Sequence, residues 1–351
     1  MVNVLIVEDS RVVSEYLYYI LSKDPQIQVV GNVSNGKQAI EFIKEHKPDV
    51  VSMDIEMPIM NGLEATRIIM STTPLPIIIV TASRNANEVA TSMEALAAGA
   101  LAIIEKPVGI GHPDEKRLSE QLVMLVKLMA EVKVVSRKFK KQAPLKQIEM
   151  PTKSVLPRTS LPKTQVVAIG VSSGGPQTLN KVFSKISGKF PVPILVVQHI
   201  AEGFLSGLVG WLVKNTAIPI LVAEEGMALL PGHVYFAPDR RHLGVSKSGK
   251  VILAECENGS TLCPSVAYLF SSITKVYGEA GLGIILTGMG SDGAQELKTM
   301  KDTGATTIAQ DKESSLIHGM PGVAIKIGAA KHVMSACEIG QLLYELELKV
   351  R

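Results

Sequence analysis

Charged and hydroxyl side chains stand at the ends of short apolar runs in the first third of the chain. They are Glu8 and Asp9, Asp54, Thr81, and Lys106. Short apolar runs of this kind are typical of strands in a parallel sheet, and the carboxyl ends of such strands meet at one edge of the sheet. We therefore expect three carboxylates, a hydroxyl and an ammonium group to lie in one cleft.

Three carboxylates in one cleft repel one another unless a cation lies between them. Carboxylate oxygens are the ligands of hard divalent ions, and Mg²⁺ is the ion that serves phosphoryl transfer. One carboxylate could then act as nucleophile and form an acyl phosphate, while the lysine and the threonine bind the phosphate. Each residue alone could have a structural role, as a helix cap, a strand residue or a turn, and only their joint placement favours phosphoryl chemistry.

A second set of reactive side chains follows later apolar runs. Ser172 lies in the small-residue turn at 170–174, near a predicted helix start whose free N–H groups can stabilise an oxyanion. His199 follows the run at 194–197, and Asp292 lies in a glycine-rich loop after another run. A serine nucleophile, a histidine base and an orienting acid at one sheet edge are what acyl transfer requires.

Parts of this second set could also serve a different purpose. The turn around Ser172 could bind a phosphate or be a plain tight turn. The chain order serine, histidine, aspartate differs from that of the α/β-hydrolases, in which the histidine comes last. The sequence has no His-Glu-x-x-His motif, so a zinc hydrolase has no support. The remaining histidines are expected in loops or on helices without a catalytic role: His46, His112, His233, His242, His318 and His332.

The elements that must position these residues can be predicted from the hydrophobic pattern. Strands alternate with helices over residues 1–108, which predicts an α/β fold with a (βα)5 unit and a parallel sheet. Residues 137–165 are basic and interrupted by prolines, as expected of a linker. A second alternating pattern from Val166 predicts a doubly wound, Rossmann-like α/β domain. Within it, residues 234–236 and 251–253 are expected to form a hairpin-like insertion.

Composition excludes several classes of protein. The 351 residues are 46% hydrophobic and 20% charged, which is typical of a globular chain of two domains. A net charge of +3 and 4% aromatic residues give no support to a nucleic-acid partner. Three cysteines fit a reducing cytoplasm. No apolar run approaches the roughly 20 residues of a membrane span, and no signal peptide is recognisable. We therefore expect a cytoplasmic protein without membrane insertion.

The N-terminal residues resemble a response-regulator receiver domain. The matching strings are 7–10, 53–58 with 61–62, 80–82 and 105–107. The resemblance implies that Asp54 accepts phosphate from a chemotaxis histidine kinase and that Thr81 and Lys106 form the switch. It also implies a Mg²⁺ site made by Glu8 (through water), Asp9, Asp54 and the Glu56 carbonyl. One departure is Ile103, which stands where many receivers have an aromatic residue.

The second domain resembles the chemotaxis protein-glutamate methylesterase family. The matching strings, besides the serine turn, are 232–239, 263–266, 286–294, 309–311 and 319–321. The resemblance implies that Ser172 is the nucleophile, His199 the general base and Asp292 its orienting acid. Backbone N–H groups near Ser173 and Met289 are the expected oxyanion donors. Two departures are Gly322, where a basic residue is expected, and Ser173, where threonine is common.

The two resemblances together imply a domain plan and a function. The plan is a receiver at 1–125, a helix end and linker at 126–163, and a methylesterase catalytic domain at 164–351. The implied substrates are glutamate γ-methyl esters, and also glutamines, on methyl-accepting chemotaxis receptors, with the receiver blocking the cleft until Asp54 is phosphorylated. Mg²⁺ would serve only the receiver, ester hydrolysis would need no cofactor, and we expect a monomer.

Two alternatives to this function remain open. One is a serine esterase of the same fold, and the other is a phosphorylation-regulated binding module, each in a non-chemotactic pathway. A DNA-binding response regulator has no support, because no helix-turn-helix pattern follows the linker.

Overall fold

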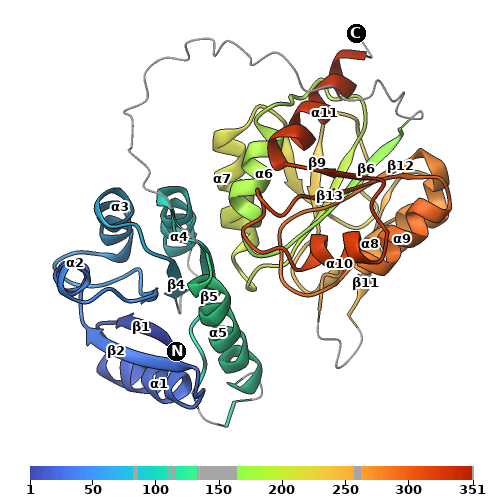
Figure 1. Cartoon of the computed structure of the whole chain (residues 1–351). Helices are drawn as coiled ribbons and strands as arrows, with labels where there is room; N and C mark the ends of the chain where they lie inside the picture. Colours follow the sequence, from blue (N-terminus) through green and yellow to red (C-terminus); the bar gives the residue numbers. More distant parts are fainter. Residues whose placement is uncertain are drawn as a thin grey trace.

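Figure 1 shows a computed structural model of the chain, in which two α/β domains lie side by side. The structure describes residues 1–81, 86–109, 111–112, 115–132, 134, 164–256 and 262–349, without the side chains of residues 86–90. Most of the expected linker at 137–165 lies outside these residues. Among the helices described, none is both long and apolar enough to span a membrane.

The N-terminal domain is built on a five-stranded sheet in the order β2-β1-β3-β4-β5, in which every pairing is parallel. Its strands are β1 (Val2–Val7), β2 (Ile27–Val33), β3 (Val50–Met53), β4 (Ile77–Thr81) and β5 (Ala102–Glu105). Its helices are α1 (Arg11–Ser22), α2 (Gly36–Glu45), α3 (Gly62–Thr72), α4 (Ala86–Ala98) and α5 (Glu115–Ala130). The predicted (βα)5 unit is confirmed.

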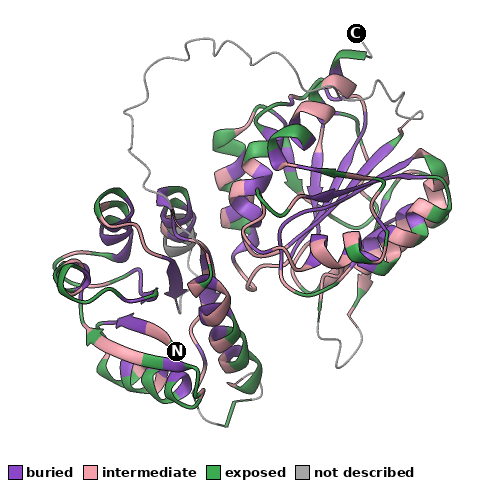
Figure 2. Ribbon diagram, in the orientation of Figure 1, coloured by how far each residue is buried: buried purple, intermediate pink, exposed green. Residues whose placement is uncertain are grey.

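Successive side chains of the central strand β1 pack into different hydrophobic clusters, one on each face of the sheet. Val4 and Ile6 belong to the hydrophobic cluster that contains the buried side of α1 and α5. Leu5 and Val7 belong to the cluster that contains residues of α2, α3 and α4. Because both faces are buried there, residues 4–7 form a continuous apolar run, as is typical of parallel sheets (Figure 2).

The C-terminal domain is built on a seven-stranded sheet in the order β14-β13-β12-β6-β7-β9-β8. All its pairings are parallel. Its strands are β6 (Val166–Val171), β7 (Ile194–Gln198), β8 (Ile220–Val222), β9 (Val234–Phe236), β12 (Gly281–Ile285), β13 (Thr306–Gln310) and β14 (His332–Met334). The chain first places β7, β8 and β9 on one side of β6, and then places β12, β13 and β14 on the other side. The strand order therefore reverses between β6 and β12, where open α/β sheets bind ligands.

Helices cover both faces of this second sheet. They are α6 (Gly175–Phe183), α7 (Leu205–Asn215), α8 (Val266–Tyr277), α9 (Ala294–Asp302), α10 (Met320–Lys326) and α11 (Ala336–Lys349). Buried residues of α6, α7 and α11 share one hydrophobic cluster with the sheet, and those of α8, α9 and α10 share the other. The predicted doubly wound α/β domain is confirmed.

The expected hairpin was placed wrongly in part. Residues 234–236 form β9, which pairs with β7 and β8 inside the parallel sheet. The hairpin consists instead of β10 (Arg241–Val245) and β11 (Val251–Glu255), which pair in antiparallel fashion. A three-residue apolar run carries too little periodicity to distinguish a buried parallel strand from one arm of a hairpin.

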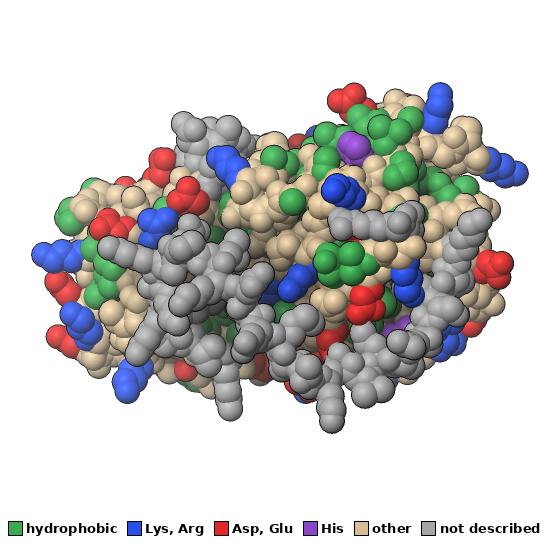
Figure 3. All heavy atoms as spheres, turned by 90° about the horizontal axis from the view of Figure 1, so that it is seen from above, with side chains coloured by type: hydrophobic (Ala, Val, Ile, Leu, Met, Phe, Trp, Pro, Cys, Tyr) green, Lys and Arg blue, Asp and Glu red, His purple; other side chains and the backbone are tan. Residues whose placement is uncertain are grey.

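In the described part of the chain, the two domains contact each other at the following places. Helix α4 packs against α6 and α7, and the Gln177 side-chain amide donates hydrogen bonds to the carbonyls of Leu96 (3.3 Å) and Ala100 (3.1 Å). On the other side, Ile317 belongs to the hydrophobic cluster of β5 and α5, and Met289 packs against that cluster. Acidic and basic side chains are interspersed on the part of the molecular face that Figure 3 shows in colour.

Candidate active site

Ser172 is the first residue after β6, where the chain turns into α6. Its amide donates to the Thr287 carbonyl (3.0 Å), and its own carbonyl accepts from the Gly175 amide (2.9 Å). Gly174, which precedes α6, has a φ of 80°, a conformation that costs glycine no strain. The turn therefore holds Ser172 at the carboxyl end of β6 and next to the N-terminus of a helix.

His199 lies beside Ser172 because of the register between β6 and β7. Val171, the last residue of β6, is paired with Gln198, the last residue of β7. The residues that follow them, Ser172 and His199, therefore lie side by side at the edge of the sheet. The His199 amide donates to the Val171 carbonyl at 2.9 Å, which continues the parallel ladder by one residue. The structure thus brings together the serine and the histidine predicted from the sequence.

Asp292 reaches the same place from the loop after β12, the strand on the other side of β6. Its Oδ2 lies 3.0 Å from His199 Nε2, and both side chains are largely buried. The amides of Val266 and Ala267 donate to the carboxylate at 2.7 and 3.0 Å, and the Ser265 hydroxyl donates at 3.0 Å. Asp292 therefore occupies the N-terminus of α8, where the helix dipole also favours a negative charge.

The electrostatics of Asp292 suit an orienting acid. Burial raises the pKa of this carboxyl group, but the interactions with His199 and the two α8 amides outweigh burial and hold its pKa below the ordinary value. An ionised carboxylate next to Nε2 favours a proton on that nitrogen. The other ring nitrogen, Nδ1, then carries the free lone pair that a general base needs.

Gln198 is a contributor that sequence reasoning missed. Its side-chain amide donates to the carbonyls of both Ser172 (2.9 Å) and His199 (2.8 Å), and its side chain is buried. It ties the two strand ends together directly behind the reactive residues. A Cβ at Gly175 would lie 2.0 Å from Gln198 Oε1, so only glycine at that position leaves room for this amide.

One predicted oxyanion donor, Ser173, follows Ser172 in the same turn, and the other, Met289, lies in the loop after β12. A Cβ at Gly288 would come within 2.6 Å of Ser172 Cβ, so glycine allows the loop after β12 to approach the serine closely. As far as the structure describes the chain, the backbone N–H groups of Ser173 and Met289 donate to no acceptor. They are therefore available to an incoming oxyanion.

The acidic residues of the N-terminal domain also meet at one sheet edge. Glu8, Asp9 and Asp54 each offer a carboxylate oxygen, and these atoms lie within 4.8 Å of one another. Lys106 Nζ lies 2.8 Å from Glu8 Oε2 and 2.9 Å from Asp54 Oδ2. Buried Thr81 ends β4, and its carbonyl accepts from the Lys106 amide (2.9 Å). The five residues predicted to share a cleft therefore lie together.

Burial dominates the titration of this acidic cluster. It raises the pKa of Glu8 and of Asp54, and the nearby Lys106 offsets the shift only in part. Burial lowers the pKa of Lys106, but its bonds to the two carboxylates outweigh burial, so that pKa is raised. Three carboxyl groups therefore lie beside a single ammonium group.

The donor set of the acidic cluster fits a hard divalent cation. All three candidate ligands are carboxyl groups, whose oxygens are the ligands that hard divalent ions take. Asp9, Glu56 and Asn61 line an open depression of about 580 Å³ beside the cluster, which gives an ion access. Glu56, the predicted carbonyl ligand, therefore lines the same depression as Asp9.

A glycine shapes the loop beneath Asp54. A Cβ at Gly62 would lie 1.9 Å from the Asp54 carbonyl oxygen, so only glycine lets α3 begin this close to the end of β3. The Gly62 amide donates to the Ile55 carbonyl at 2.9 Å, and the Ile55 amide donates to Asp54 Oδ1 at 2.8 Å. The loop thus fixes one oxygen of Asp54, while Lys106 lies against the other.

Two family models match the chain. The model described as CheB methylesterase matches residues 167–343, and the model of the response regulator receiver domain matches residues 4–115. The solved structure of the Thermotoga maritima CheB methylesterase catalytic domain is 36% identical, with a TM-score of 0.50. The match covers 52% of this chain and 98% of the chain in the solved structure.

Curated relatives match almost the full length. A protein-glutamate methylesterase/protein-glutamine glutaminase of Nitrosospira multiformis is 45% identical over 348 residues, 99% of this chain and 97% of the relative. A protein of Geobacter metallireducens with the same name, numbered 4, is 45% identical over 352 residues, 99% of this chain and 100% of the relative. With both domains matched and the two sites built as described, the chain belongs to the CheB methylesterase family.

Proposed function

We propose that this chain is a phosphorylation-controlled protein-glutamate methylesterase that also deamidates glutamines on methyl-accepting chemotaxis receptors. The observation that carries the proposal is the convergence of Ser172, His199 and Asp292 on the edge formed by β12, β6 and β7. The names of the full-length relatives supply the substrate class. We place the receiver at 1–125, the helix end and linker at 126–163 and the catalytic domain at 164–351, in a cytoplasmic monomer.

In the first half of the reaction, the Ser172 hydroxyl attacks the γ-carbonyl carbon of the methyl ester. His199 takes the serine proton on Nδ1, while its Nε2 stays beside the Asp292 carboxylate, 3.0 Å from Oδ2. The Ser173 and Met289 amides stabilise the oxyanion that forms. Collapse of the tetrahedral intermediate breaks the ester bond, and His199 returns the proton to the departing methanol.

In the second half, water hydrolyses the γ-glutamyl ester of Ser172. His199 takes a proton from the water and returns it to the serine, which regenerates the enzyme and leaves a free glutamate carboxylate. A glutamine side chain follows the same route and releases ammonia instead of methanol. Apart from the substrate and this water, the scheme uses only groups of the chain itself.

In the receiver, Asp54 is the proposed phosphate acceptor from a histidine kinase. Glu8, Asp9, Asp54 and the Glu56 carbonyl are the residues that would hold Mg²⁺, which supplies positive charge to the incoming phosphoryl group. Asp54 lies at the base of the cluster with Lys106 on one carboxylate oxygen, and Lys106 would exchange that contact for the phosphate. Thr81 at the end of β4 would donate its hydroxyl to the same phosphate.

The domain contact offers a route from the receiver to the active site. Met289, a proposed oxyanion donor, packs against the hydrophobic cluster of β5 and α5. Gln177 on α6, the helix that begins next to Ser172, binds two carbonyls of the receiver. A contact of this kind blocks the cleft in the unphosphorylated state, and a change at Lys106 or Thr81 that weakens it exposes the catalytic loops.

The catalytic part of the proposal is tested by methanol release from methylated receptor fragments. Ser172→Ala should lower the rate by about 10⁴-fold or more, because no other group takes the place of the nucleophile. Ser184→Ala, an exposed serine at the end of α6, serves as the matched control and should keep the wild-type rate. A Ser172→Ala protein with more than a tenth of the wild-type rate would exclude this mechanism. An inert wild-type protein would favour a binding module.

A further inference from the structure

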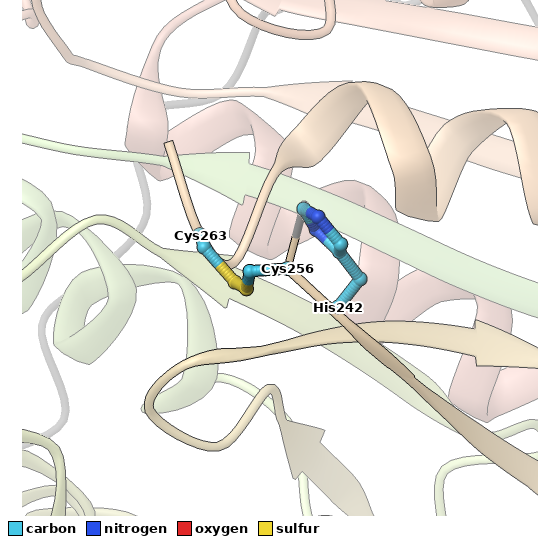
Figure 4. Close-up of side chains that lie close together, drawn as sticks. All are labelled: His242, Cys256 and Cys263. Atoms are coloured by element: carbon cyan, nitrogen blue, oxygen red, sulfur yellow. A yellow bond between two sulfur atoms is a disulfide. The ribbon is translucent and has the colours of Figure 1, made fainter. Parts of the chain in front are cut away.

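A pair of cysteines lies beside the N-terminus of α8, outside the set of residues that the proposed reaction uses. Cys256 directly follows β11, and Cys263 stands three residues before the start of α8. The two are joined as a disulfide, with their Cα atoms 6.0 Å apart, within the usual range for such a bond. A ring nitrogen of His242 lies within 4.8 Å of both sulfurs (Figure 4).

The surroundings of the pair suit reversible thiol chemistry. Both cysteines are partly exposed, so a small thiol or disulfide can reach them. An adjacent imidazole favours the thiolate, which is the form that attacks a disulfide. In a reducing compartment, disulfides are uncommon, and those that occur are usually transient and responsive to redox conditions.

The cysteine pair is linked to the candidate triad by a short stretch of chain. Only Pro264 separates Cys263 from Ser265, whose hydroxyl donates to Asp292 and whose amide donates to His242 Nδ1 at 3.2 Å. The next two amides of the chain, at Val266 and Ala267, also donate to Asp292. The segment that begins at Cys263 therefore supplies three hydrogen bonds to the carboxylate that orients His199.

The same segment is held on its other side by the hairpin. His242 of β10 accepts from the Ser265 amide and stacks on Tyr268 of α8, with ring centroids 4.9 Å apart. The disulfide adds a covalent tie between the end of β11 and the same segment. Without the disulfide, only non-covalent contacts hold the residues before α8 against the hairpin.

We propose that Cys256 and Cys263 form a redox-responsive disulfide whose reduction loosens the hold of the α8 N-terminus on Asp292 and lowers hydrolase activity. The predicted effect on activity rests on the proposed hydrolase function, whereas the redox site and its effect on α8 do not.

The oxidation balances with a low-molecular-weight disulfide such as oxidised glutathione. One cysteine thiolate attacks it, forms a mixed disulfide and releases one thiol. The second cysteine then attacks the protein sulfur of the mixed disulfide, forms the Cys256–Cys263 bond and releases the second thiol. Two electrons pass from the cysteine sulfurs to the reagent, and the two cysteine protons end on the two released thiols. Excess reduced glutathione reverses both steps.

The first experiment is a redox titration of the full-length protein in glutathione buffers, followed by alkylation and measurement of the intact mass. A Cys337→Ser background removes the exposed third cysteine. We expect a single transition from two alkylated thiols to none. Two alkylated thiols in fully oxidising buffer would overturn the proposal. So would a mixed disulfide that persists, or one zinc ion per chain held by the two thiolates and His242.

The second experiment measures hydrogen exchange at the start of α8 in the two redox states. Reduction should speed exchange at Val266 and Ala267 about threefold or more, while the α6 amides stay unchanged. The Cys256→Ser/Cys263→Ser variant should exchange like the reduced protein in every buffer. Equal exchange in both states would overturn the link to Asp292, even if the disulfide forms.

The third measurement is methanol release by the same samples. Reduction should lower the rate about 3- to 10-fold, because the orienting acid is held less firmly. The double serine variant should show the low rate and no response to redox buffer, whereas Cys337→Ser should respond like the wild type. Equal rates in both states would overturn the effect on activity. Absence of activity in both states would count against the proposed hydrolase function, while the first two experiments would still decide the redox site.

Discussion

Replacement of Asp292 by asparagine tests the orienting role of this residue with the smallest change in shape. The carboxylate receives Ser265 Oγ and Ala267 N on Oδ1, and Val266 N on Oδ2, which also lies next to His199. An asparagine has one acceptor oxygen and one NH₂ group. Whichever way it turns, the NH₂ group meets at least one backbone N–H donor, so one bond is lost.

The expected losses differ in size for activity and for stability. Activity should fall by about 10⁴-fold, because the neutral amide no longer selects the productive imidazole tautomer or stabilises its charged form. Loss of one hydrogen bond to a charged group, about 1.5–3 kcal/mol, and of the favourable interaction with the α8 dipole, about 0.3–1 kcal/mol, should lower the free energy of unfolding by about 2–4 kcal/mol.

The contribution of Asp292 to the free energy of unfolding also depends on pH. The folded-state pKa of Asp292 is lowered, so its carboxylate stabilises the protein above the unfolded-state value of about 3.9. That contribution disappears as the pH falls through the folded-state value. The difference in unfolding free energy between wild type and Asp292→Asn should therefore be full at pH 7 and shrink below about pH 4.

The measurements are methanol release and chemical unfolding of the full-length protein at several pH values. Asp302→Asn, an exposed aspartate at the end of α9, is the matched control and should change neither quantity. An Asp292→Asn protein that keeps more than a tenth of the wild-type rate and unfolds with unchanged free energy would refute the orienting role.

Three further predictions concern the receiver and the domain contact. Gln177→Ala removes two hydrogen bonds to the carbonyls of Leu96 and Ala100, so unphosphorylated activity in a methanol assay should rise about 3- to 10-fold. Mg²⁺ at 100 times its dissociation constant should stabilise the receiver by about 2.7 kcal/mol in a thermal melt, and Asp9→Asn should remove most of this effect. Gly62→Ala should destabilise the receiver and impair labelling by a small phosphodonor, because a Cβ there would lie 1.9 Å from a backbone oxygen.

Each of these predictions has a control and a contradicting result. Gln295→Ala, on the exposed face of α9, should leave basal activity unchanged, and equal effects of the two glutamine variants would rule out the domain contact. Full Mg²⁺ stabilisation of Asp9→Asn would remove Asp9 from the ligand set. Gly210→Ala, at an exposed position of α7 with open space around it, should be tolerated, and equal tolerance of Gly62→Ala would contradict the packing argument.

The sheet edges of both domains could be predicted from the sequence because continuous apolar runs mark their central strands. Such runs coincide with β1, β3, β4, β5, β6, β7 and β12, and the reactive residues lie at or soon after the carboxyl ends of these strands. Once the strands are parallel, their ends must share an edge, so Asp54 and Lys106, or Ser172 and His199, come together without further information.

The parts that could not be predicted depend on contacts distant in sequence. The three-residue strands β8 and β14 are too short to carry a period, and they are strands only because neighbours pair with them. Gln198 has no sequence signal, since its role arises from two backbone carbonyls that the fold places within reach. The same holds for the donors around Asp292 and for the meeting of Cys256 with Cys263 across a closed loop.

Methanol release from methylated receptor fragments, measured with and without a small phosphodonor and Mg²⁺, tests the proposed function most directly. We predict that phosphodonor raises the rate of the wild type, leaves Asp54→Asn at its basal rate, and gives no methanol with Ser172→Ala in either condition. Stimulation of Asp54→Asn to the wild-type level, or methanol release by Ser172→Ala at a rate near that of the wild type, would contradict this function.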